Sequence, residues 1–147
     1  MKSFFYYVMA QASPFIVQLA LSGMRIGIGA LSVGHGYPKL LGGPAAWRMY
    51  GLAMSHLGIT WWPEMWGLLA ACTEFFCGVA LVVGLCTRLA VLPLLFMMFV
   101  AFKMHVASSD PFSVYSFPLT LIVVFAALFF IGSGTLSLDA LLTRFEG

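Results

Sequence analysis

Two ionisable side chains inside long apolar stretches are the first candidates for chemistry in this sequence: Arg25 and Glu74. An arginine at the centre of a membrane-spanning helix costs roughly 2.5–3.5 kcal/mol on insertion scales, so each charge needs a partner within the protein. Counted from Lys39 and Glu64, both side chains lie about 15–20 Å from the same membrane surface. Matched depth and opposite charge predict an Arg25–Glu74 ion pair inside the protein.

Further polar side chains are expected above this pair, toward the same surface. Arg25, Ser32 and Lys39 recur every seven residues and are therefore nearly in line on one helix. The pattern predicts a polar shaft in the membrane that binds a ligand. The candidate ligand-binding residues are Arg25, Ser32, His35, Lys39, Glu74 and His105.

A purely structural role is the alternative for these residues. The ion pair could serve only to hold two helices together, although buried pairs are weak stabilisers once desolvation is counted. Each histidine taken alone is more often a hydrogen-bonding residue than a ligand. Intramembrane charges nevertheless mark functional sites by default, which favours the pocket.

Other chemistries find little support in the sequence. No spacing of metal ligands, nucleophile elbow or phosphate-binding glycine loop is present. Haem held by His35 and His105 is disfavoured, and no covalently bound cofactor or metal is implied. Cys72, Cys77 and Cys86 form no C-x-x-C motif, and we interpret them as packing residues.

The composition indicates an integral membrane protein. Hydrophobic residues make up 62% of the chain and charged residues only 8%, with a mean hydropathy of +1.02. Soluble domains contain about 25% charged residues, so this chain could not cover a water-facing surface and must face a lipid bilayer. A net charge of +2 and the lack of a basic run exclude nucleic acid as a partner.

The elements that would position these residues form one membrane domain over residues 1–147. Spans are predicted at about 14–40, 64–85, 88–107 and 117–133, with an interfacial helix at about 44–58. Short links between spans predict an all-α, up-and-down four-helix bundle with short interfacial helices. Ser137 is expected to cap a short tail helix, and the aromatic run 4–7 to lie at headgroup level.

Several of these segments together resemble the DoxX family of small four-span bacterial membrane proteins. The resemblance rests on His35-Gly-Tyr-Pro-Lys39 after an arginine-bearing span, on Glu74 and His105, and on the segments 84–88 and 134–142. It implies a four-helix membrane bundle in the bacterial inner membrane. It also implies an association with membrane redox systems, such as thiosulfate:quinone oxidoreductase subunits and partners of soluble sulfur- or superoxide-handling enzymes. Arg25, His35, Lys39, Glu74 and His105 are the matching residues.

The expected function is therefore that of a redox-associated membrane subunit with an exchangeable quinone-like or lipid-like ligand in the shaft. Electrons would come from the quinone or from soluble or membrane-bound partner proteins, and the sequence is compatible with oligomerisation. A non-enzymatic scaffold or assembly partner is the second hypothesis, and a small-solute conduit the third. Because Lys2, Arg88 and Arg144 flank one side, positive-inside counting predicts both termini in the cytoplasm once Lys39 and Lys103 are set aside.

Overall fold

Four helices long and apolar enough to cross a membrane account for most of the chain in the computed structural model, which describes residues 13–145. About 85% of the described residues are helical, and none of them lies in a strand. The prediction of an all-α membrane helical bundle is confirmed. The aromatic run 4–7 lies outside the described residues.

The long helices follow the apolar stretches of the sequence. The first is α2 (Pro14–Leu41), and the second consists of α4 (Pro63–Cys72), η2 (Thr73–Cys77) and α5 (Gly78–Val83). The third is α6 (Thr87–Ala107) and the fourth is α7 (Phe112–Ile131). The fourth helix begins five residues earlier than predicted. Pro118 lies in its second turn, and the helix continues through it.

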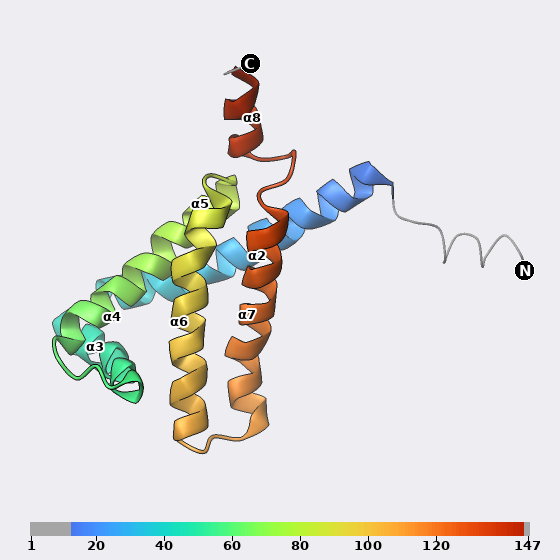
Figure 1. The fold of residues 1–147 in the computed structure, drawn as a ribbon. Helices are drawn as coiled ribbons and strands as arrows, with labels where there is room; N and C mark the ends of the chain where they lie inside the picture. The colour runs from blue at the N-terminus through green and yellow to red at the C-terminus, as the bar shows by residue number, and fades with distance from the viewer. Residues whose placement is uncertain (1–12, 146–147) are drawn as a thin grey trace, which may run out of the picture.

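These helices form two antiparallel hairpins that cross at an angle (Figure 1). One pairs α2 with η2 and α5, and the other pairs α6 with α7. Side chains from all four spans form one buried core between them. The core residues are Leu21, Leu81, Ala90, Val91, Leu94, Met98, Phe125 and Leu128.

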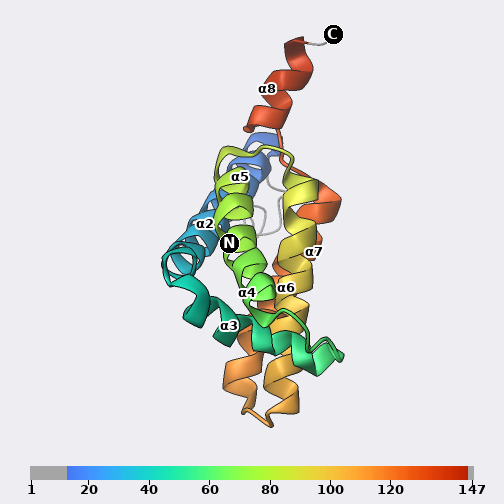
Figure 2. The same ribbon diagram turned by 90° about the vertical axis from the view of Figure 1, so that its left-hand side faces the viewer.

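The long connection after the first span consists of two short helices, α3 (Gly43–Gly51) and η1 (Leu52–Leu57), where one helix was predicted. Gly51 and Gly67 have no room for a side chain, because a Cβ at either would overlap the backbone of the facing helix. The connection therefore packs closely on α4, and η1 reaches α6 (Figure 2). Through this packing α4 extends beyond the end of α2.

A tail helix, α8 (Leu138–Phe145), follows the last span at the end of the bundle where α2 begins, which we call the termini end (Figure 1). The predicted cap is confirmed: the amide of Ala140 donates to Oγ of Ser137 at 3.2 Å. Asp139 in the first turn has a second role. Its carboxylate accepts from the amides of Cys86 at 2.7 Å and Thr87 at 3.3 Å, and so caps the start of α6.

Candidate functional site

Close contacts between glycines fix the register of α2 against the second span. A Cβ on Gly29 would lie 2.8 Å from the carbonyl oxygen of Gly78, and one on Gly36 would lie 2.8 Å from Cβ of Glu74. Only glycine permits such an approach, as is usual where membrane helices pack tightly. The register places Glu74 beside the last turns of α2.

Lys39 is the partner of Glu74. Its Nζ lies 2.7 Å from Oε1 of the carboxylate, with the lysine side chain 24% exposed and the glutamate side chain 7% exposed. The second oxygen, Oε2, is buried and has no hydrogen-bond partner among the described residues. A carboxylate oxygen left in this state is costly unless something else donates to it.

Glu74 lies in a five-residue π-helical segment, η2, between two α-helical segments. Such single-turn π-bulges are rare and occur often at functional sites. A Cβ on Gly36 would lie 2.5 Å from the amide nitrogen of Phe75, so α2 touches the backbone of this segment directly. The irregular turn and the buried acid therefore coincide.

The connection helix α3 completes the surroundings of the pair. Nζ of Lys39 lies 5.1 Å from the ring centre of Tyr50, a cation–π contact. Nε1 of Trp47 donates to the carbonyl oxygen of Lys39 at 2.9 Å, which ties α3 to the end of α2. We call Lys39, Glu74 and Tyr50 the Lys–Glu site.

Arg25 is not part of this site, and the predicted Arg25–Glu74 ion pair is wrong. The guanidinium donates from Nη1 to the carbonyl oxygens of Leu81 at 2.6 Å and Val82 at 3.3 Å, and from Nη2 to that of Leu136 at 2.8 Å. Arg25 thus satisfies carbonyls at the end of α5, where a positive charge also complements the helix dipole. Only 1% of the residue is exposed.

The failure of that prediction has a geometric cause. Depth was counted from Lys39 and Glu64 as if both marked the same surface, but the first turns of α4 lie beyond α2 and pack on α3. Glu74 consequently faces Gly36, and Arg25 lies eleven residues earlier, about 16 Å away along the helix. Arg25 lies near the middle of α2, whereas Glu74 lies beside its last turns.

Comparison with known proteins agrees with this architecture. The DoxX family model matches residues 20–107, more than half of the chain. The chain belongs to the DoxX family. No curated protein and no solved structure gives a significant match. The matched region contains the whole Lys–Glu site and ends before α7.

The remaining predicted ligands of this DoxX protein are spread over several places. The Ser32 hydroxyl donates to the carbonyl of Ile28 in its own helix at 2.9 Å. The His35 ring is exposed and lies edge-on to Phe117 of α7, 6.4 Å between centres. His105 Nδ1 lies 2.8 Å from Oδ2 of Asp110 at the turn between α6 and α7. Of the six predicted residues, the structure joins only Lys39 and Glu74.

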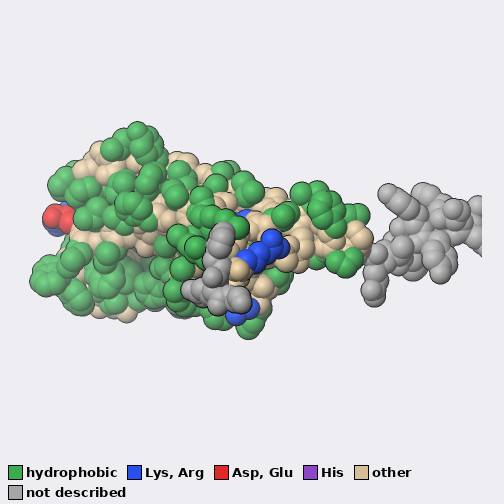
Figure 3. All heavy atoms as spheres, turned by 90° about the horizontal axis from the view of Figure 1, so that it is seen from above, with side chains coloured by type: hydrophobic (Ala, Val, Ile, Leu, Met, Phe, Trp, Pro, Cys, Tyr) green, Lys and Arg blue, Asp and Glu red, His purple; other side chains and the backbone are tan. Residues whose placement is uncertain are grey.

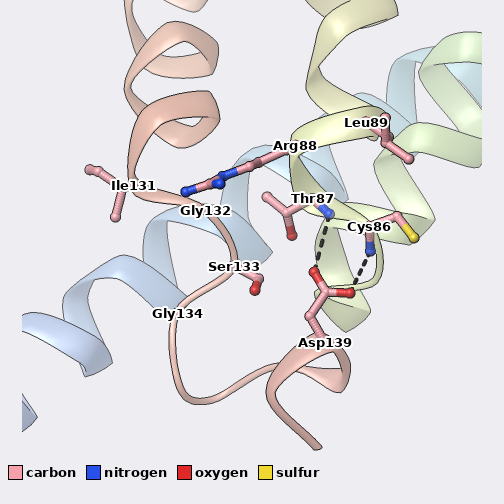
Figure 4. A pocket seen from close by; sticks show the side chains of 9 residues that line it. All are labelled: Cys86, Thr87, Arg88, Leu89, Ile131, Gly132, Ser133, Gly134 and Asp139. Carbon is pink, nitrogen blue, oxygen red and sulfur yellow. Dashed lines mark hydrogen bonds between the residues drawn. The ribbon is translucent and has the colours of Figure 1, made fainter. Parts of the chain in front are cut away.

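A cavity of about 330 Å³ lies at the termini end of the DoxX protein, not beside the Lys–Glu site (Figure 4). It is open to the outside and is lined by the start of α6, the end of α7 and Asp139. The sequence analysis predicted the ligand-binding shaft near the other end of α2, where His35 and Lys39 lie. The sequence indicates the observed cavity only weakly, because its two glycines, serine and arginine are also common at ordinary helix ends.

Proposed function

We propose that this DoxX protein binds a quinone-like or lipid-like molecule at the Lys–Glu site and serves membrane redox metabolism in the bacterial inner membrane. The observation that carries the proposal is the unpartnered Oε2 of Glu74, buried within a π-helical turn of a membrane span. A buried carboxylate that uses one oxygen and leaves the other open is suited to accept a hydrogen bond from a bound molecule.

The pair offers both kinds of group that a quinone headgroup needs. Lys39 has three N–H donors and uses one on Glu74, so another can reach a quinone carbonyl. Oε2 of Glu74 can accept from the hydroxyl of the reduced form, and the carboxylate can take up or release that proton. The site would thus bind both redox states of the ligand.

Aromatic side chains provide a surface for the ring of such a ligand. Tyr50, 37% exposed, lies under Lys39. Tyr37, 54% exposed, lies 6.2 Å from the ring of Phe75, the residue after Glu74. Partly exposed rings at the side of a membrane bundle can receive an amphiphilic molecule directly from the bilayer.

Electrons would reach the site from outside this chain. Family membership supports a partner that is a soluble or membrane-bound redox protein, with the DoxX protein as its membrane subunit. Both termini would face the cytoplasm, following the positive-inside count. Assembly into larger oligomers is compatible with this arrangement.

Titration with a short-chain ubiquinol, the reduced form whose hydroxyl can donate to Oε2, tests the proposal. Binding of the ligand should quench the tryptophan fluorescence of the purified protein in detergent. Glu74→Gln should weaken binding by about tenfold, the size of one charge-assisted hydrogen bond. Glu64→Gln is the matched control, because Glu64 is exposed and only 3.5 Å from the exposed Arg48. Equal affinities for the parent and Glu74→Gln would contradict the proposal.

A scaffold role is the second candidate, and the Arg25 network favours it. Arg25 joins α2, the end of α5 and the segment before α8 through three carbonyls. A protein built only for assembly would need this network and no ligand. In that case the parent would bind no quinone, while Arg25 variants would lose a partner protein in co-purification.

A further inference from the structure

The cavity at the termini end contains a hydroxyl group without a partner. Thr87, at the first position of α6, is 1% exposed, and its Oγ1 has no hydrogen bond among the described residues. Figure 4 shows this oxygen directed into the cavity, on the side of Ser133 and Asp139. A buried hydroxyl in this state is expected to meet a molecule that occupies the cavity.

Arg88 lines the same cavity. Its guanidinium is exposed, and Nη2 donates to the carbonyl oxygen of Phe130 at 3.2 Å, at the end of α7. A Cβ on Gly132 would lie 3.4 Å from Nε of Arg88, so the glycine lets the arginine lie close to the backbone. The other N–H groups of the guanidinium fork have no bond within the described part of the chain. The planar fork of an arginine matches the oxygens of a phosphate.

The charge of the cavity also favours an anion. Asp139 is the one acidic group in its lining, and both of its oxygens already accept from backbone amides of α6. Basic side chains gather at this end of the molecule (Figure 3).

Apolar side chains continue from the polar lining down the outside of the bundle. Leu89 is 67% exposed and Ile131 is 58% exposed, and both line the cavity. Phe130, beside them, is 77% exposed. Because α6 begins here and α7 ends here, we expect this level to lie near the boundary between lipid headgroups and hydrocarbon. The arrangement suits a ligand with an anionic head and apolar tails.

We propose that this cavity binds the phosphate of a membrane glycerophospholipid. The phosphate accepts hydrogen bonds from the Thr87 hydroxyl and the Arg88 guanidinium, with the hydroxyl of Ser133 beside it, and the acyl chains run along Leu89 and Ile131. This site is independent of the Lys–Glu site, which lies at the other end of α2. It would hold the α6–α7 hairpin at a defined depth in the membrane.

Thermal unfolding of the delipidated full-length protein, with and without dioleoyl phosphatidylglycerol, tests the inference. The lipid should stabilise the parent, because a ligand that binds only the folded state shifts unfolding. Thr87→Val keeps the shape of the side chain and removes the hydroxyl, so it should fold normally without lipid. Its affinity for the lipid, measured by native mass spectrometry, should fall by about tenfold, as should that of Arg88→Gln.

Arg144→Gln is the matched control, since Arg144 is an exposed cation in the last turn of α8 and not in the cavity. It should bind the lipid as the parent does. Equal losses in Arg144→Gln and Thr87→Val would show that only surface charge matters and would overturn the inference.

Two further probes identify the ligand class. Dioleoylglycerol, which lacks the phosphate, should give no stabilisation, and equal stabilisation would overturn phosphate recognition. Inorganic phosphate should also fail to protect, and full protection by it would overturn the assignment to a lipid.

Discussion

Lys39 of α2 donates a hydrogen bond to Glu74 of the π-helical segment, with 2.7 Å between Nζ and Oε1. The bond joins the end of the first span to the middle of the second. It also leaves one carboxylate oxygen open in the membrane. The same pair of residues therefore stabilises the fold and provides the proposed ligand contact.

Removal of Lys39 should destabilise the protein strongly. Lys39→Met leaves the Glu74 charge buried without its partner, and we expect a loss of about 3 kcal/mol in the free energy of unfolding, at the low end for a broken buried pair because Lys39 is partly exposed. Arg48→Met, at the exposed pair with Glu64, should cost at most about 1 kcal/mol. Reversible unfolding in mixed micelles measures both, and equal losses would contradict the buried pair.

Arg25 should be more important for stability than for ligand binding. Arg25→Met leaves the Leu136 carbonyl without its donor and removes one of the two donors of the Leu81 carbonyl, at an expected cost of about 3 kcal/mol. Arg25→Lys should recover only part of it, because a single ammonium cannot replace the planar fork. Quinone affinity per folded molecule should stay at the parent value in both variants. A loss of quinone binding without a loss of stability would contradict this prediction and would show that Arg25 contributes to the ligand site.

Gly36 should be essential for the geometry of the Lys–Glu site. In Gly36→Ala the new methyl would meet the backbone of Phe75 and Cβ of Glu74, so α2 must move away from η2. We expect a lower melting temperature and weaker quinone binding. Gly34→Ala is the control, because a Cβ there meets nothing within 4 Å. Identical behaviour of the two variants would show that the register of α2 is not as described.

Native Cys86 provides a test of orientation in the membrane. It is exposed at the termini end, while Ser55 is exposed in the connection at the other end. With Cys72 and Cys77 replaced by alanine, a membrane-impermeant thiol reagent added to intact cells should label Ser55→Cys but leave Cys86 unlabelled. Labelling of Cys86 in intact cells would place the termini outside the cytoplasm.

The sequence predicted the helices well because their physical causes are local. Apolar length identifies the spans, and Ser137 and the glycines near residue 42 identify helix ends. A single charge in an apolar run was also a sound indication that Arg25 and Glu74 are buried. These features depend only on neighbouring residues.

The partners of the buried charges could not be predicted in this way, because they depend on the register between helices. That register is set by contacts of Gly29, Gly36, Gly51 and Gly67, each with backbone far away in the sequence. The π-helical turn at Glu74 leaves no visible pattern in the sequence, and the bond of Arg25 to Leu136 spans most of the chain. Tyr50 lies on another helix than Lys39, so no local pattern in the sequence identifies the two as neighbours.

The most direct test of the central claim is mass analysis of the lipid-soluble molecules that stay bound to the protein purified from its native membrane. The parent and Glu64→Gln should retain a quinone-class molecule in a defined molar ratio, and Glu74→Gln should lose most of it while keeping its helical circular dichroism spectrum. Retention of the same amount by Glu74→Gln, or a folded parent that carries no such molecule, would contradict ligand binding at Glu74.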